Sequence, residues 1–112
     1  MLNKRKEAAM KVARSLWAAE DALDAALARA AELSGALVSA RVDANLSAIV
    51  AQDAFEGAAA ALATIAKARG ELVETHRRLT EAKIQIGLRT LATGDEQKPP
   101  MAAQEPHLKA VA

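Results

Sequence analysis

Every seventh residue from Leu2 to Ile86 is apolar, and this repeat constrains the fold more than any other feature of the sequence. The repeat fills thirteen consecutive positions, and with 52% hydrophobic residues in the chain, chance would rarely fill them all. Seven residues make close to two turns of an α-helix, so these side chains return to nearly the same face. We therefore predict helices that pack side by side along this row, crossing at about 20°. The seam row, as we call it, consists of Leu2, Ala9, Leu16, Leu23, Ala30, Leu37, Ala44, Ala51, Ala58, Ile65, Leu72, Leu79 and Ile86.

A companion row lies three positions further along and is made of mostly small residues. In the first part of the chain it contains Val12, Ala19, Ala26 and Leu33. We assign the opposite helix faces to charged residues, namely Lys11, Arg14, Asp21, Arg29 and Glu32. Thirty alanines favour helix but bury little apolar surface each. One Trp, one Phe and few β-branched residues argue against a sheet.

The residues that could end a helix or form a turn leave two topologies open. Gly35, after Ser34, can end a helix as a residue of positive φ, or it can lie inside a continuing helix. Asp43-Ala44-Asn45 is a second possible turn. Asp53 with Glu56 three residues later resembles a capping pattern for the next helix, and Glu74 with Arg78 has the spacing of a helical ion pair. The prediction is an all-α fold, either an antiparallel helical hairpin or a three-helix domain with heptad-like Ala/Leu packing.

The domain boundaries follow from the same signals. We predict a helical domain over residues 1–94, with helices at about 4–34 and 54–91 and a middle segment at about 36–52. Residues 95–112 hold all three prolines and little periodicity, which predicts a flexible C-terminal tail.

The predicted function follows from the surface that such a fold leaves uncovered. Two paired helices cover only one side of each seam, so we expect a homodimer or docking onto a protein partner. The chain is thus predicted to be a non-enzymatic interaction module, an adaptor, chaperone or regulator. In size and composition it resembles short helical secretion chaperones and coiled-coil adaptors. The predicted contact residues are Leu16, Trp17, Leu23, Ile65, Leu72, Leu79 and Ile86.

Two alternative functions depend on charged and titratable residues. The segment around His76 resembles a histidine-phosphotransfer helix, although the Lys-Gly of that motif is missing, and a His on a bundle helix is more often structural. Two basic clusters, Lys4-Arg5-Lys6 and His76-Arg77-Arg78, are the candidate nucleic-acid contacts. Glu71, Glu74 and Glu81 interleave with the second cluster, so a solvated helix face is the favoured interpretation and nucleic-acid binding is not expected.

Other site chemistry is not predicted. There is no cysteine, no phosphate-binding Gly-rich loop and no nucleophile motif, so we expect no catalytic residues, cofactor or small-molecule substrate. The carboxylates lack the Glu-x-x-His spacing of a bundle metal site. The N-terminal cations are followed by charges that interrupt any signal-peptide core, and no apolar stretch is long enough for a membrane span, so we expect a cytoplasmic protein with no membrane contact.

Overall fold

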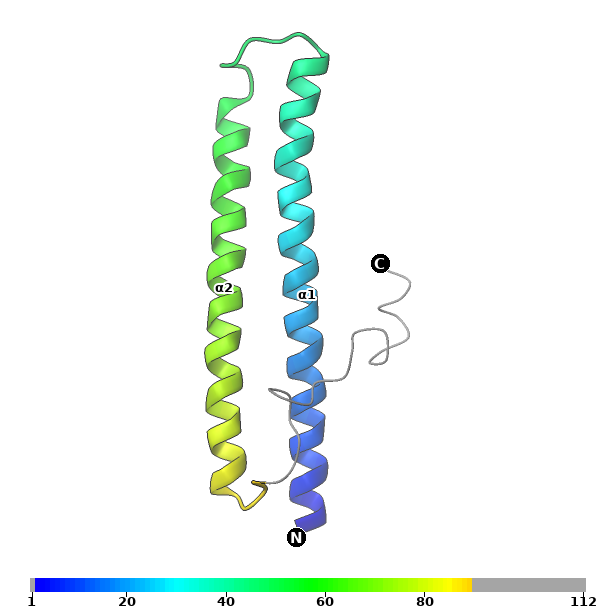
Figure 1. Cartoon of the computed structure of the whole chain (residues 1–112), viewed down its shortest axis with the longest axis vertical. Helices are drawn as coiled ribbons and strands as arrows, with labels where there is room; N and C mark the ends of the chain where they lie inside the picture. Colours follow the sequence, from blue (N-terminus) through cyan, green and yellow to red (C-terminus); the bar gives the residue numbers. More distant parts are fainter. Residues whose placement is uncertain (1, 90–112) are drawn as a thin grey trace. The chain divides into compact units, whose positions relative to one another are not determined.

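The computed structural model describes residues 2–89 of the 112-residue chain, and within them it contains two helices and no strand (Figure 1). Helix α1 spans Leu2–Asp43 and helix α2 spans Gln52–Gln85, with a connection at 44–51 between them. The all-α prediction is therefore confirmed, and the three-helix alternative is wrong. The predicted tail at 95–112 lies outside the described residues.

Helix α1 continues through Ser34 and Gly35, where the sequence left a break open. Ser34 Oγ donates a hydrogen bond to the carbonyl oxygen of Ala30 at 3.2 Å, as serines do inside helices. A glycine inside a helix costs only about 1 kcal/mol relative to alanine. That cost does not stop the helix, and its continuation keeps Leu37 half-buried on the seam row.

Both helices end in the same C-terminal motif. At the end of α1 the amide of Leu46 donates to the carbonyl of Arg41, and the amide of Asn45 donates to Val42. Asn45 has a φ of 57°, so it is the left-handed residue of a Schellman motif. Helix α2 repeats this arrangement, with Gly87 at a φ of 87°. The turn at Asp43-Ala44-Asn45 is thus the one that ends α1, and Ser34-Gly35 is not.

The start of α2 differs in detail from the predicted cap. Helix α2 begins at Gln52, one residue before Asp53, and Ala51 precedes it with a φ of 62°. Asp53 Oδ1 accepts a hydrogen bond from the amide of Ala54 at 2.9 Å and lies within the first turn. Its negative charge there still favours the helix, because the exposed amides of a helix N-terminus carry partial positive charge.

The chain divides into two compact units, and each contains a segment of both helices. The described part of unit 1 comprises residues 2–21 and 72–89, and unit 2 comprises residues 22–71. In unit 1, His76 on α2 contacts Glu20 on α1. In unit 2, Arg69 on α2 contacts Asp24 on α1. In unit 2 the chain runs along α1 into the connection at 44–51 and returns along α2. Unit 2 is therefore an antiparallel helical hairpin.

The seam row is the covered row of these helix pairs. Its members are buried or half-buried from Ala9 to Leu37 and from Ala58 to Leu79. At the ends of the helices the row is open, since Leu2 and Ile86 are exposed. The companion row is much less covered, and Val12 and Leu33 are both about half exposed. The two rows therefore differ in what they can still contact.

Candidate protein-interaction site

A groove in unit 1 is the candidate site, and it lies along the open side of the paired segments. It has a volume of about 280 Å³ and is lined mostly by apolar side chains. Ala8, Ala9 and Ala82 are small, so they leave a depression between the larger side chains that stand around it. The groove is lined by Arg5, Ala8, Ala9, Val12, Ala13, Leu16, His76, Leu79, Ala82, Lys83 and Ile86.

Both rows of the sequence pattern contribute to this groove. Leu16 and Leu79 belong to the seam row and are buried and half-buried, so they form its inner surface. Val12 of the companion row is 47% exposed and Ile86 is 43% exposed. Fully burying an exposed aliphatic side chain of this size contributes roughly 1.5–3 kcal/mol, and each of these two, which are about half covered, can contribute roughly half of that. These two exposed residues therefore offer most of the energy that a partner could gain here.

Two cations, Arg5 on α1 and Lys83 on α2, are the charged members of the lining. Their aliphatic stems can extend the apolar surface beneath the charged ends. Within residues 2–89, no carboxylate lines the groove. The groove therefore combines an apolar floor with positive charge, and this favours an apolar ligand with negative charges beside it.

The predicted contact residues fall into three groups. Leu16 and Trp17 are buried, and Leu23, Ile65, Leu72 and Leu79 are half-buried, whereas Ile86 is exposed. Three of them, Leu16, Leu79 and Ile86, line the groove of unit 1. The contact of all seven with a partner stays a prediction. Most of their surface is already covered within the chain, so the exposed companion row, in particular Val12, is the better candidate.

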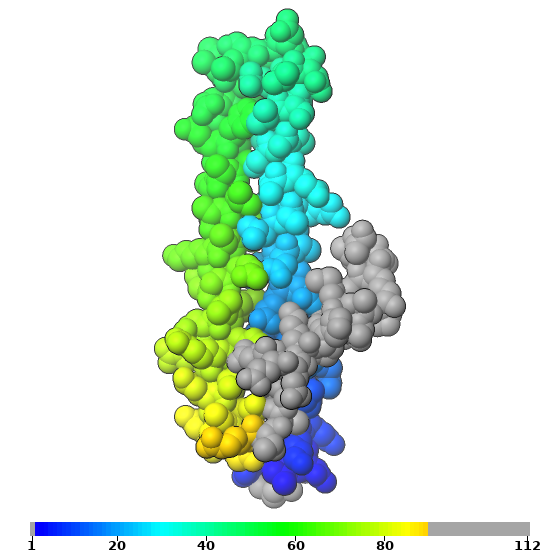
Figure 2. Space-filling model, in the orientation of Figure 1, coloured from blue at the N-terminus to red at the C-terminus, as the bar shows by residue number. Residues whose placement is uncertain are grey.

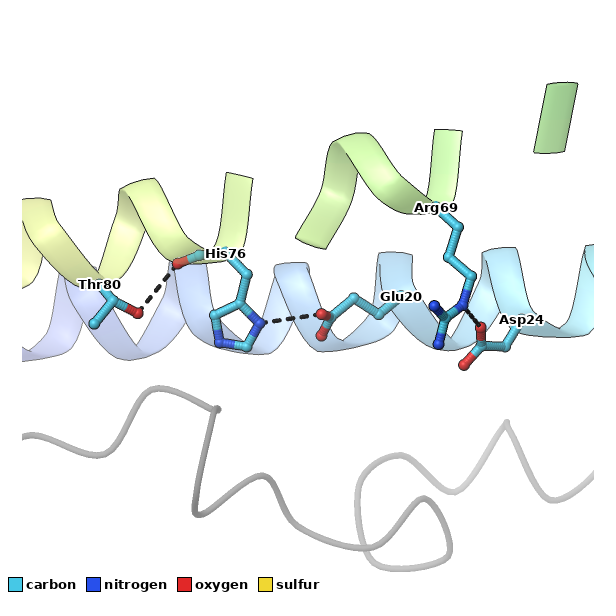
Figure 3. Close-up of polar contacts among 5 residues, drawn as sticks. All are labelled: Glu20, Asp24, Arg69, His76 and Thr80. Atoms are coloured by element: carbon cyan, nitrogen blue, oxygen red, sulfur yellow. Dashed lines mark hydrogen bonds and ion pairs between the residues drawn. The ribbon is translucent and has the colours of Figure 1, made fainter. Parts of the chain in front are cut away.

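His76 belongs to the inner surface of unit 1 and is not an accessible imidazole. Its side chain is 10% exposed, and its Nδ1 lies 3.1 Å from Glu20 Oε2 (Figure 3). A carboxylate oxygen accepts hydrogen bonds, so this contact is made by a form of the ring in which Nδ1 carries a hydrogen. On the next turn of α2, Thr80 Oγ1 donates to the carbonyl oxygen of His76 at 3.1 Å. The first hydrogen bond involves the imidazole ring of His76, and the second involves its backbone carbonyl.

Two acidic residues of α1 are covered, and for one of them the sequence pattern predicted exposure. Asp21, which we assigned to the outward face of the first helix, is 4% exposed, so that assignment is wrong. Glu20 is half-buried beside His76. Buried polar groups are found where they have partners, and a partner on the other helix is invisible to a periodicity argument. The only available signal was that both acids adjoin Trp17 and the seam.

Ion pairs between exposed side chains lie elsewhere on the described surface. Arg69 Nε donates to Asp24 Oδ1 at 2.6 Å in unit 2 (Figure 3), and about half of each side chain is exposed. In unit 1, Arg78 Nε donates to Glu74 Oε1 at 3.0 Å, which confirms the predicted pair, and Arg77 binds the other oxygen. These two hydrogen bonds lower the pKa of Glu74 below its ordinary value, and the bond to Glu74 raises the pKa of Arg77.

No protein-family model, curated protein or solved structure matches this chain. Within residues 2–89 no helix is long and apolar enough to cross a membrane. The same part of the chain brings no three histidine or carboxylate side chains together as a metal-ligand group.

Proposed function

We propose that this chain is a non-enzymatic interaction module that binds protein by packing helices against the open side of its own. The observation that carries this proposal is the difference in solvent exposure between the two apolar rows. The seam row is covered inside the helix pairs except at their ends, while Val12 of the companion row and Ile86 at the end of the seam row stay exposed at the groove. An apolar groove between two helices is a common docking site for an amphipathic helix or a similar apolar element.

The amount of exposed aliphatic surface supports this proposal. Eleven large hydrophobic residues of the described chain are exposed, and no large side chain is fully buried. Single exposed apolar residues are ordinary on protein surfaces. Here, however, Val12 and Ile86 border a single concave surface with Leu16 and Leu79 beneath them. A concave apolar surface of this kind can receive the apolar side chains of a partner helix.

The two alternative functions have weaker support. Phosphotransfer needs an imidazole nitrogen that a phosphodonor can approach, and the His76 side chain is covered and hydrogen-bonded to Glu20. Nucleic-acid binding needs free cations on one face. In the second basic cluster, Arg77 and Arg78 are both bound to the Glu74 carboxylate. We therefore propose neither of them.

Site-specific crosslinking inside cells tests the proposal. A photoreactive phenylalanine analogue would replace Val12, which lines the groove, or Arg14, which is exposed on α1 and does not line it. We expect covalent adducts from position 12 that mass spectrometry identifies as a second copy or as one recurring protein, with several-fold fewer from position 14. Equal yields at both positions, or no adduct at position 12, would refute the proposal.

A further inference from the structure

The connection between the helices carries the most exposed large hydrophobic residue of the described chain. Ile49 is 81% exposed, and Leu46 and Val50 beside it are exposed as well. Val42, in the last turn of α1, extends this surface. Figure 2 shows the connection as the surface at one end of unit 2. We call these four residues, Val42, Leu46, Ile49 and Val50, the apolar tip.

The tip is held in one conformation by several local hydrogen bonds. The Schellman motif fixes Asn45 and Leu46, and Arg41 Nη1 also donates to the carbonyl oxygen of Leu46 at 3.4 Å. Further on, the amide of Val50 donates to Ser47 and the amide of Gln52 donates to Ile49. A loop that is ordered before binding loses little conformational entropy when it binds. The tip is therefore built like a ligand for an apolar depression.

The groove of unit 1 has the size that such a ligand needs. Its volume is about 280 Å³. An apolar cavity of about 150 Å³ admits a benzene molecule. The groove can therefore take one or two aliphatic side chains such as those of Ile49 and Leu46.

The charges around the two surfaces are opposite in sign. Unit 1 carries nine Lys or Arg against five Asp or Glu in its described residues, whereas unit 2 carries four against six. More locally, Arg5 and Lys83 line the groove, and the acids Asp43, Asp53 and Glu56 flank the apolar tip, with Arg41 as the one cation near them. Complementary charge promotes association and selects the partner.

We propose that the groove of unit 1 receives the apolar tip of a second copy of this chain. The inference rests on the proposed function and names the occupant of the same site. The contact joins two different surfaces, so two copies related by a two-fold axis make it twice. A higher rotation axis closes the copies into a ring, and a relation that does not close gives an open chain. Ile49 is the central anchor, and the acids around the tip lie next to Arg5 and Lys83.

Sedimentation velocity on the full chain, over roughly 5 to 500 µM, tests this contact. Ile49→Lys places a cation on the tip and brings it toward the cations of the groove. Ala82→Glu places an acid and extra volume in the groove, and Ala8→Glu is a second variant of the same kind at another exposed lining position. Val73→Lys, at an exposed aliphatic residue outside both surfaces, is the matched control.

We expect each tip or groove variant to lose association alone and a mixture of the two kinds to regain it. The wild-type chain and Val73→Lys associate with rising concentration, and each tip or groove variant alone associates at least about tenfold more weakly. An equimolar mixture of Ile49→Lys and Ala82→Glu recovers association, because the first retains an intact groove and the second an intact tip. Equal helical circular dichroism of all variants shows that folding is unaffected, and Ala8→Glu replaces Ala82→Glu if the latter fails this check.

Three results would overturn the inference. They are a wild-type chain that stays monomeric throughout, variants that associate as well as the wild type, or a mixture that recovers nothing. The first of these, combined with adducts from position 12 to another protein, leaves the proposed function intact and removes only the self-association. A monomeric chain with no adduct at position 12 removes both.

Discussion

Replacing Gly35 with alanine should stabilise the chain, although the sequence allows Gly35 to be a helix terminator. In the structure this residue lies eight positions before the end of α1, without a positive φ, and an added Cβ would meet no atom within 4 Å. Alanine inside a helix is favoured over glycine by about 1 kcal/mol, because the unfolded chain then has less backbone freedom to lose. No clash subtracts from this gain.

Gly87 provides the matched comparison. An added Cβ there would also meet nothing within 4 Å, but the residue has a φ of 87°. An alanine in this left-handed region is strained, at a cost of roughly 1–2 kcal/mol. Gly87→Ala should therefore destabilise the chain by about the amount that Gly35→Ala stabilises it, although both changes add the same methyl group to open space.

Thermal and urea unfolding followed by circular dichroism at 222 nm measures both effects. About 1 kcal/mol corresponds to a Tm shift of roughly 4–8 °C for a domain of this size. All samples must have the same protein concentration, because self-association would add to the apparent stability. A lower Tm for Gly35→Ala would mean that the chain reverses near Ser34-Gly35 after all. A higher Tm for Gly87→Ala would contradict the Schellman motif at the end of α2.

Two further predictions concern side chains of unit 1. Leu16→Ala should destabilise the fold by about 2 kcal/mol or more, because Leu16 is buried. Val12→Ala should change the urea midpoint little and mainly weaken association, because Val12 is exposed. Equal urea midpoints for the two variants would contradict the assignment of covered and open rows. Arg77 and Arg78 lower the pKa of Glu74, so this carboxylate contributes stability above its ordinary pKa of 4.5, and the contribution is lost as the pH falls through the lower folded value. Glu74→Gln should remove that part of the acid dependence, and an unchanged pH profile of the urea midpoint would show that the pair contributes nothing.

The ion pair that the sequence predicted is the one with a local cause. The pair between Glu74 and Arg78 needs only helical spacing, and it is present. The ion pair between Arg69 and Asp24 joins residues 45 positions apart, so it depends on which faces of two helices meet. The same is true of Glu20 and His76, which are 56 positions apart. No pattern within one helix contains that information.

The sequence by itself determined that the chain is helical and which row of side chains the helices bury. Alanine content and the seven-residue repeat are properties of neighbouring residues, and α1 and α2 follow from them. Only the tertiary structure decided that the first helix ends at Asp43 instead of Leu33 or Ser34, that Asp21 is covered, and that Val12 stays open beside a groove. Those outcomes were undetermined in the sequence because a turn can preserve the phase of a repeat. A glycine likewise costs too little to end a helix that gains packing beyond it.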